Sequence, residues 1–330
     1  MHLKLKSKSK KKGILRMSID VKLTKDTGNG WTRRQFVAGA LAGAGVLAVR
    51  SRWLEIAKAG TINGKQGAAE IVTLGHTGIK VSRLAQGTGF NGSGRSSAHT
   101  RLGQKEFTKL IRHSLDNGIT LMDMADLYGS HRYVRTALDG VPRDKYRLLS
   151  KIWPRKEYWN SPSGGAKEEV DRFRRELNTD VIDICLIHCM MDPEWPNKFE
   201  RVRDELSEMK QKGDVRAVGV SCHDFGALKV ASAHPWVDVI LARINNAGKE
   251  AFMDASVEEV TTVLKQARTN GKVIIGMKIF GAGRLVKPDQ KDASLQYVLG
   301  NKLVDAITVG MLSTEQVDDT IERINNVFSA

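Results

Sequence analysis

The sequence predicts an α/β chain that folds as a (β/α)8 TIM barrel. Short apolar runs alternate eight times with amphipathic stretches between about residue 70 and the C-terminus. The runs are apolar on both faces, as expected for parallel strands covered by helices. The alternation fits within residues 60–330, close to the ~250 residues typical of this fold. A doubly wound open sheet is the alternative, but no G-x-G-x-x-G fingerprint follows the first strand.

The expected strands and helices follow one another in order along this segment. The strand runs are SRLAQGTG (82–89), ITLMDMAD (119–126), YRLLSKIW (146–153), VIDICLIHC (181–189), VRAVGVSC (215–222), VDVILARIN (237–245), KVIIGMKIF (272–280) and AITVGML (306–312). Helical spacing is seen at 106–118, 166–178, 199–213, 257–271 and 314–328, and several of these stretches end in Asn-Gly or Lys-Gly, which favour helix termini. One barrel accounts for the whole pattern without a second domain.

The positive charge of the chain lies mostly at its beginning. The formal net charge is +15, and residues 1–59 hold 14 Lys/Arg against 3 Asp/Glu. The remaining chain, with 38 basic and 34 acidic residues, is nearly balanced at +4. No concentrated basic stripe is left on the barrel, so nucleic-acid binding is not expected.

Residues 1–59 are predicted to form a leader with a twin-arginine export signal. Arg33 and Arg34 directly precede a short apolar run, Phe36 to Val49, and Ala57-Lys58-Ala59 offers an A-x-A cleavage site. The run is shorter than the roughly 20 residues that span a bilayer. The export machinery is therefore an expected partner, and the periplasm the expected location. A buried or amphipathic helix preceded by a solvated charge run is the alternative.

Two features of this leader stay open. Arg50 and Arg52 separate the apolar run from the cleavage site, so an uncleaved signal that anchors the chain in the membrane is an alternative to cleavage. Translation from Met17 is also compatible with the signal, because the residues before it add nothing that the signal needs.

Four polar residues stand at or just after the ends of predicted strands, where the chemistry of a TIM barrel is located. They are Asp123, Tyr128, Lys151 and His188. Strand alternation points Asp123, Lys151 and His188 into the barrel together. The alternative is a purely structural ion pair between Asp123 and Lys151 with a core histidine, but a buried pair is seldom more stable than an apolar replacement.

At these residues the chain resembles the aldo-keto reductase family, over essentially all of residues 70–330. LGHTGIKVSRLAQGTG, MDMADLYG, LLSKI, DVIDICLIH and RAVGVS follow the family's order and spacing. The resemblance implies NAD(P)-dependent reduction of an aldehyde or ketone, or oxidation of the alcohol. It makes Tyr128 the general acid, Lys151 and Asp123 the pair that tunes it, and His188 the group that orients the carbonyl. A nearby ammonium is expected to lower the pKa of the phenol.

The resemblance also implies the residues that hold the cofactor, NADP or NAD. The matching positions are Gly87, Thr88, Ser221, Cys222, Lys278, Gly281, Gly283, Gly310, Ser313 and Gln316. Several neighbouring positions depart from the commoner pattern. Cys222 replaces an Asn, Leu241 a Gln, Met277 a stacking Tyr, and Thr320 an Asn near the adenine. The loop GMLSTEQ lacks the Lys and Arg that grip the 2′-phosphate in many relatives.

A cluster of potential metal ligands is also present: Cys185, His188, Cys189, Cys222 and His223. Alternation places Cys185 and Cys189 on the helix-facing side of their strand, opposite to His188, so no metal site is expected. The three cysteines are too few for a disulfide-stapled fold and are expected to be buried thiols. Trp153, Tyr158, Trp159 and Trp195 either border a substrate pocket or cover the barrel rim.

Two functions of different classes remain. The first is an exported carbonyl reductase or alcohol dehydrogenase that acts on a small molecule. The second, prompted by the altered nicotinamide contacts, is an exported barrel that binds a nucleotide or ligand without catalysis, as an inactive partner subunit would. Retention of Asp123, Tyr128, Lys151 and His188 favours the enzyme, because a binding protein has no need of the buried charged pair.

Overall fold

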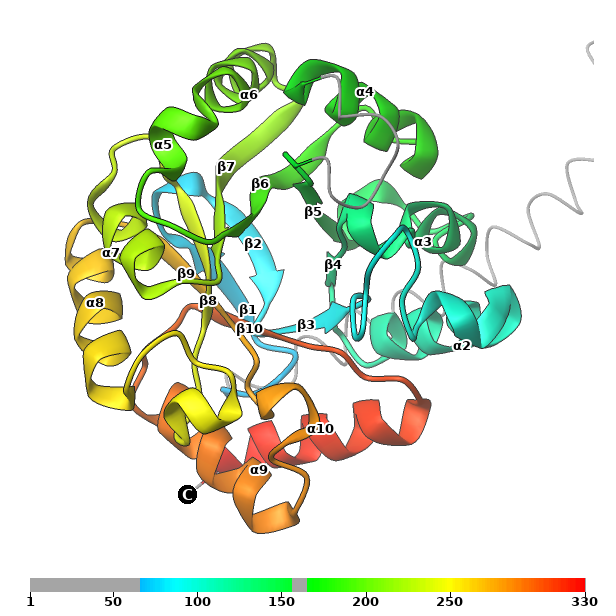
Figure 1. Cartoon of the computed structure of the whole chain (residues 1–330). Coiled ribbons are helices and arrows are strands. Elements are labelled where there is room, and N and C mark those ends of the chain that lie inside the picture. Colours follow the sequence, from blue (N-terminus) through cyan, green and yellow to red (C-terminus); the bar gives the residue numbers. More distant parts are fainter. Residues whose placement is uncertain (1–65, 156–164, 330) are drawn as a thin grey trace, which may run out of the picture. The chain divides into compact units, whose positions relative to one another are not determined.

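A closed barrel of eight parallel strands forms the centre of the computed structural model, which describes residues 66–155 and 165–329. The strands follow one another around the barrel in the order β10-β3-β4-β5-β6-β7-β8-β9, with helices outside them (Figure 1). The predicted leader, residues 1–59, lies outside the described residues, as do Tyr158 and Trp159. The (β/α)8 barrel predicted from the sequence is confirmed.

Each barrel strand lies within one of the predicted runs, except that β6 extends one residue beyond its run, to Met190. The strands are β3 (Leu84–Gly87), β4 (Leu121–Asp123), β5 (Arg147–Ile152), β6 (Ile182–Met190), β7 (Val215–Cys222), β8 (Val239–Arg243), β9 (Val273–Met277) and β10 (Ala306–Val309). The apolar runs predicted the strands well because β-strands buried on both faces leave little room for polar residues.

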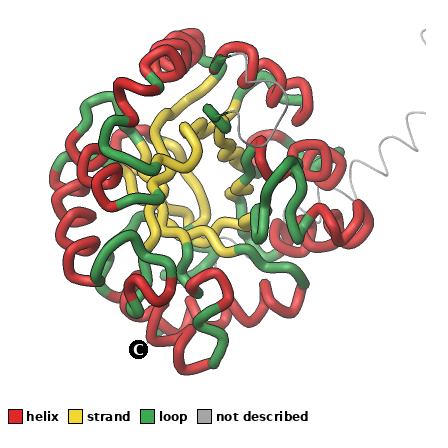
Figure 2. The backbone as a smooth tube through the Cα atoms, in the orientation of Figure 1, coloured by secondary structure: helices red, strands yellow, loops and turns green. Residues whose placement is uncertain are grey.

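The helices form a ring around the strands (Figure 2). They are α2 (Gly103–Asp116), α3 (His131–Ala137), α4 (Ala166–Leu177), α5 (Trp195–Lys198), α6 (Glu200–Lys212), α7 (Phe225–Ala233), α8 (Val257–Thr269), α9 (Pro288–Leu295) and α10 (Thr314–Val327). The sequence predicted the long helices but not α3, α5, α7 and α9, because fewer than three turns give too few repeats of the 3.6-residue pattern. No helix in the described part of the chain is long and apolar enough to cross a membrane.

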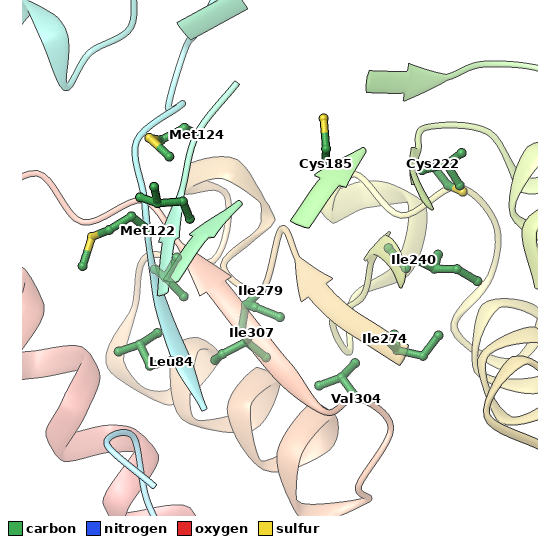
Figure 3. Packing of buried hydrophobic residues seen from close by; sticks show 14 of the residues in the cluster. Leu84, Met122, Met124, Cys185, Cys222, Ile240, Ile274, Ile279, Val304 and Ile307 are labelled. Atoms are coloured by element: carbon green, nitrogen blue, oxygen red, sulfur yellow. The ribbon is translucent and has the colours of Figure 1, made fainter. Parts of the chain in front are cut away.

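Two apolar cores hold the barrel together. The outer core lies between strands and helices and includes Met122, Cys185, Cys222 and Ile240, which Figure 3 shows among their neighbours. The inner core fills the barrel itself with one side chain or two from most strands: Ala85, Leu121, Leu149, Ile184, Leu186, Ala217, Val239, Leu241, Val273, Ile275, Met277 and Ala306. The interior is therefore a packed core, as in other TIM barrels.

An antiparallel hairpin, β1 (Ile71–Leu74) and β2 (Ile79–Ser82), precedes the barrel and was not predicted as a pair of strands. Leu74, Ile79 and Val81 are fully buried and pack with the inner core of the barrel. The hairpin leads directly into β3 and so lies at the amino ends of the strands. Apolar side chains thus close that end, which leaves the carboxyl ends for the polar residues.

Candidate active site

Four polar side chains converge at the carboxyl end of the barrel. Asp123 ends β4, and Lys151 and His188 lie near the ends of β5 and β6 on the same inward face as Leu121, Leu149 and Leu186. Tyr128 follows β4 in the 3-10 turn η3 (Asp126–Tyr128). The convergence predicted from strand alternation is therefore present.

The Lys151 ammonium is fully buried and is held by two hydrogen-bond acceptors. Its Nζ donates hydrogen bonds to Asp123 Oδ1 and to the carbonyl of Met124, the latter at 2.8 Å. The second carboxylate oxygen of Asp123 accepts a hydrogen bond from Thr308 Oγ1 at 2.9 Å. Burial lowers the pKa of Lys151, and the neighbouring Asp123 carboxylate opposes that shift. The carboxylate therefore favours the charged form of the buried lysine.

Tyr128 lies between this pair and His188. Its phenol oxygen is 3.4 Å from His188 Nε2, and Lys151 Nζ is 4.9 Å from the centre of its ring. Burial lowers the pKa of His188 well below its usual value, with the charge of Lys151 adding to the effect, so the imidazole is neutral. One small oxygen atom can contact both the phenol hydroxyl and the imidazole.

The structure alters one expectation about Tyr128. Burial raises the pKa of its phenol well above the usual value, and the Asp123 carboxylate adds to that shift. The Lys151 ammonium, which was expected to lower this pKa, is neutralised by Asp123 at contact distance and lies over the ring. The phenol is therefore protonated at neutral pH, which is the form that a general acid needs.

A glycine slot holds the ring of Tyr128. A Cβ atom at Gly89 would come within 2.2 Å of Tyr128 Cε2, and one at Gly92 within 2.5 Å of Tyr128 Cδ1. Both glycines belong to the loop that follows β3. The ring can lie here only because these two residues have no side chain.

Gly92→Ala is expected to lower turnover without unfolding the barrel, by pushing the ring of Tyr128 from its place. A displacement of about 1 Å at a reacting group can reduce the rate ~10²-fold. Steady-state kinetics and circular dichroism measure the two effects, and Ser93→Ala, an exposed position in the same loop, is the matched control. Turnover by Gly92→Ala equal to that of Ser93→Ala would show that the slot does not position the ring.

An ion-pair network fixes the turn that carries Tyr128. Asp126, at the start of η3, accepts hydrogen bonds from Arg172 Nη2 at 2.7 Å and from Arg95 Nε at 3.2 Å. Arg172 lies on α4 and also pairs with Glu169 and Glu176 on its own helix. Sequence reasoning missed this network, although an Asp between apolar residues in DMADLYG was a signal that it needed a buried partner.

A cavity of about 350 Å³ extends from Tyr128 and Asp123 towards the start of α10. Its walls come from the ends of β3, β8, β9 and β10 and from the loops after them. The lining residues are Gly87, Gly89, Phe90, Asp123, Tyr128, Leu241, Met277, Lys278, Ile279, Phe280, Ala282, Gly283, Leu285, Val286, Lys291, Thr308, Val309, Gly310, Met311, Leu312, Gln316, Asp319 and Thr320.

The predicted cofactor residues fall into two groups. Gly87, Lys278, Gly283, Gly310 and Gln316 line the cavity, and so do the departures Leu241, Met277 and Thr320. The other predicted residues do not line it: Thr88, Ser221, Cys222, Gly281 and Ser313.

Thr88 Oγ1 donates to the carbonyl of Asp123, Ser221 Oγ accepts from the amide of Cys189, and Ser313 Oγ caps α10 by accepting from the amide of Gln316. Gly281 is buried, and a Cβ atom at this position would come within 2.8 Å of Ala251 Cβ. Cys222 packs its thiol in the outer core instead of facing the cavity (Figure 3).

The expectation that Cys189 faces the helices is wrong. The pairing of β6 with β7 shifts its register between Ile187 and Met190, and Cys189 adopts a left-handed φ of 65°. At this bulge Met190 takes the position in the outer core, and Cys189 is half-buried outside both cores. Its thiol is near enough to Tyr128 to contribute to the raised pKa of the phenol, after burial and Asp123. A bulge adds one residue and therefore reverses the alternation beyond it.

Trp153 and Trp195 have different places. Trp153 is buried and meets the edge of the His188 ring, with 5.5 Å between ring centres. Trp195 is fully buried in the outer core. Trp153 therefore packs against His188, whereas Trp195 packs between the strands and the helices.

Two further side chains lie in this region: His223, which directly follows β7, and Arg243, the last residue of β8. The His223 ring lies 6.3 Å from that of His188, and its Nδ1 is 2.5 Å from Nη2 of Arg243. Arg243 also pairs with Asp254 at 3.1 Å. Across the described ranges, no group of three or more His, Cys, Asp or Glu side chains is arranged to hold a metal ion.

Comparison with known proteins identifies the family of the chain. A model of the aldo/keto reductase family matches residues 83–327. L-galactose dehydrogenase of Arabidopsis thaliana is 25% identical over 299 residues, which cover 79% of this chain and 89% of that protein. The NADH-specific methylglyoxal reductase of Escherichia coli is 27% identical over 220 residues, which cover 62% of this chain and 65% of that protein.

Solved structures show the same fold. An aldo-keto reductase from Bacillus halodurans in its holo form has a TM-score of 0.62 and 21% identity, covering 77% of this chain and 90% of that chain. An aldo-keto reductase from Klebsiella pneumoniae in complex with NADPH has a TM-score of 0.58 and 20% identity, covering 77% and 89%. With its barrel matched by the family model over most of its length, the chain belongs to the aldo/keto reductase family and is an oxidoreductase.

Proposed function

We propose that the protein transfers hydride between a nicotinamide dinucleotide and the carbonyl carbon of an aldehyde or ketone, with Tyr128 as general acid and base. The observation that carries this proposal is the position of Tyr128 and Asp123 at the inner end of one cavity, with His188 beside the phenol and Lys151 bound to the carboxylate. A phenol and a neutral imidazole 3.4 Å apart can bind one carbonyl oxygen between them.

The chain's own residues move the proton. The Tyr128 hydroxyl donates to the substrate oxygen as negative charge develops on it, and His188 fixes the direction of the carbonyl. The proton leaves the phenol, and the Lys151 ammonium, 4.9 Å from the ring centre, stabilises the resulting phenolate. Asp123 keeps Lys151 charged and in place. In the oxidation of an alcohol the same groups act in reverse.

The rest of the cavity fits a dinucleotide, which when bound supplies or accepts the hydride. Gly87 and Gly310 lie so close that a Cβ at Gly87 would be 3.1 Å from the amide nitrogen of Gly310, so the wall there is bare backbone. Gly283 adds a left-handed residue with open space where its side chain would be. Gln316 and Thr320 on α10 line the far end, where the adenosine would lie.

Titration of the full chain with NADH and with NADPH tests the proposal. Binding is followed by quenching of tryptophan fluorescence, because Trp153 lies beside His188. We expect one of the two dinucleotides to bind and to be oxidised when an aldehyde is added. Binding of neither dinucleotide would contradict the proposal. So would binding of one dinucleotide with no reduction of an aldehyde, in which case the parent and Tyr128→Phe would show the same lack of turnover.

The second candidate is a barrel that binds a dinucleotide without catalysis. Leu241 and Met277 favour it, because both are apolar and line the cavity beside Tyr128 where polar contacts to a carboxamide would otherwise be made. The same titration separates the two, since this candidate predicts binding with no turnover.

We also infer that the protein is exported by the twin-arginine route to the periplasm, on the strength of Arg33, Arg34 and the apolar run that follows them. The double substitution Arg33→Lys/Arg34→Lys keeps both charges and is expected to retain the protein in the cytoplasm with its barrel folded. Cell fractionation and dinucleotide binding measure the two results. The matched control is Lys22→Arg/Lys25→Arg, and export of the double variant at the control's level would contradict the inference.

A further inference from the structure

A lysine without a counter-charge stands at the inner end of the cavity. Lys278 directly follows β9, is half-buried, and lines the cavity together with Tyr128, Leu241 and Met277. Within the part of the chain that the structure describes, its ammonium makes no hydrogen bond or ion pair, and its contact is the Phe252 ring, 6.0 Å away. A half-buried ammonium with no anion beside it is costly, so its position suggests a ligand.

The backbone holds Lys278 in this place. Its φ is 59°, in the left-handed region that lysine seldom adopts. Its carbonyl accepts a hydrogen bond from Asn245 Nδ2 at 3.1 Å, and that of Met277 accepts one from the amide of Ile244 at 3.0 Å. Hydrogen bonds from the segment that follows β8 therefore hold the backbone at Lys278 in this conformation. Backbone strain of this kind often marks a functional position.

The charges around Lys278 leave the site positive. Arg243, opposite Met277 in the β8–β9 pairing, is offset by Asp254, and Lys151 is offset by Asp123. Lys278 has no such partner among the described residues. Burial lowers the pKa of Lys278, and the charges of Arg243 and Lys151 lower it further, whereas Cys189 and Asp123 oppose the shift.

Polar atoms near Lys278 also lack partners. His188 Nδ1, Arg243 Nε and Asp254 Oδ2 are buried, and none has a hydrogen-bond partner among the described residues. All three belong to the group around His188 and His223. Such atoms are rare inside a folded protein unless a ligand or solvent reaches them.

Lys278 shares the cavity wall with Tyr128, Leu241 and Met277. Its charge contributes to the lowered pKa of both His188 and His223, after burial and other causes, so it is within electrostatic reach of the two rings. The free positive charge is therefore available to the substrate.

We propose that the preferred substrate carries a carboxylate besides its carbonyl group, and that Lys278 binds this carboxylate while Arg243 adds a second positive charge behind it. The inference rests on the proposed function and specifies its substrate class. One negative charge matches the ammonium of Lys278, for which the described residues offer no ion-pair partner, and the apolar walls of Leu241 and Met277 suit a small carbon skeleton between the two ends.

Matched pairs of substrates test the inference in the full chain. Succinic semialdehyde is compared with methyl 4-oxobutanoate, and 4-carboxybenzaldehyde with methyl 4-formylbenzoate. We expect kcat/KM for at least one acid to exceed that for its ester by about 10- to 100-fold, the range of one hydrogen bond to a charged group. Equal or better use of both esters would overturn the inference.

Variants of Lys278 assign the discrimination to its charge. Lys278→Met is expected to bring the acid-to-ester ratio close to one, and Lys278→Arg to keep it. The ratio is the readout, because both members of a pair share the same chemistry. Lys265→Met, at an exposed position on α8, is the matched control and should leave the ratio at the parent value.

Two binding measurements make the test independent of turnover. Benzoate is a carboxylate with no carbonyl group to reduce, and it should bind the parent protein in calorimetric titration. Its affinity for Lys278→Met should be lower by about 10-fold or more. The dissociation constants of NADH and NADPH are measured for both proteins. A ratio and a benzoate affinity unchanged in Lys278→Met would overturn the inference, and weaker dinucleotide binding would then assign Lys278 to the pyrophosphate.

Failure of the proposed function can be told apart from failure of this inference. If no aldehyde is reduced, the proposed function fails, and the benzoate titration of the parent and Lys278→Met still decides on the carboxylate site. If the neutral esters are reduced with the same kcat/KM as the corresponding acids, the proposed function holds and the inference of a carboxylate site fails.

Discussion

Tyr128→Phe is expected to bind the dinucleotide as the parent does and to lose turnover by roughly 10²-fold or more. The substitution keeps the ring that fills the slot between Gly89 and Gly92 and removes the hydroxyl that lies 3.4 Å from His188 Nε2. At the inner end of the cavity this phenol is the proton donor that lies beside His188, where the carbonyl oxygen would bind. Steady-state kinetics and fluorescence titration measure the two quantities.

Tyr133→Phe is the matched control for this prediction. Tyr133 lies on α3, with its ring 5.3 Å from that of Phe107, and takes no part in the cavity. Its loss of the hydroxyl should leave turnover within a few-fold of the parent. Turnover by Tyr128→Phe at the level of Tyr133→Phe would mean that another group donates the proton.

Lys151→Met is expected to lower both turnover and stability. The Asp123 carboxylate would remain buried with Thr308 Oγ1 as its side-chain donor, and removal of one partner from a buried pair typically costs about 3–5 kcal/mol. Turnover should fall by roughly 10²-fold or more, because the phenolate loses its stabilising charge. Denaturant unfolding and steady-state kinetics measure the two effects.

The double variant Asp123→Asn/Lys151→Met separates the two roles of the pair. An amide in place of the carboxylate removes the unpaired charge, so the free energy of unfolding should recover by more than half of the loss. Turnover should remain at the level of Lys151→Met, since the ammonium is still absent. Recovery of turnover in the double variant would show that Lys151 acts only by supporting the fold.

The barrel and three of the four catalytic candidates could be predicted from local patterns. The strands are buried on both faces, so each appears as an apolar run, and a polar residue two positions after an inward Leu must also point inward. Leu121 with Asp123, Leu149 with Lys151, and Leu186 with His188 follow this rule. The rule depends on a period of two and on nothing distant in the chain.

Cys189 shows where the rule ends. It comes one residue after His188, and alternation assigned it to the helix-facing side. The bulge between Ile187 and Met190 inserts one residue, so the alternation breaks at Cys189 and Met190 enters the outer core in its place. A bulge depends on how one strand pairs with its neighbour, which no pattern within a single strand reveals.

The electrostatics of the site likewise depended on distant residues. The expected fall in the pKa of Tyr128 assumed a free ammonium, whereas Asp123 neutralises Lys151 and burial dominates. The network of Asp126, Arg172 and Arg95 that holds the turn joins residues far apart in the chain. Pairing and burial are properties of the assembled barrel.

The sequence by itself determined the order of strands and helices, the inward direction of Asp123, Lys151 and His188, and the family to which the chain belongs, because periodicity and motif order are local. Only the tertiary structure decided that glycines enclose Tyr128, that Cys222 packs in the outer core, and that Lys278 lines the cavity with Tyr128 and has no ion-pair partner among the described residues. Those outcomes depend on which loops meet at the carboxyl end of the barrel, and the free energy of such contacts comes from burial and charge pairing between segments that are far apart in the chain.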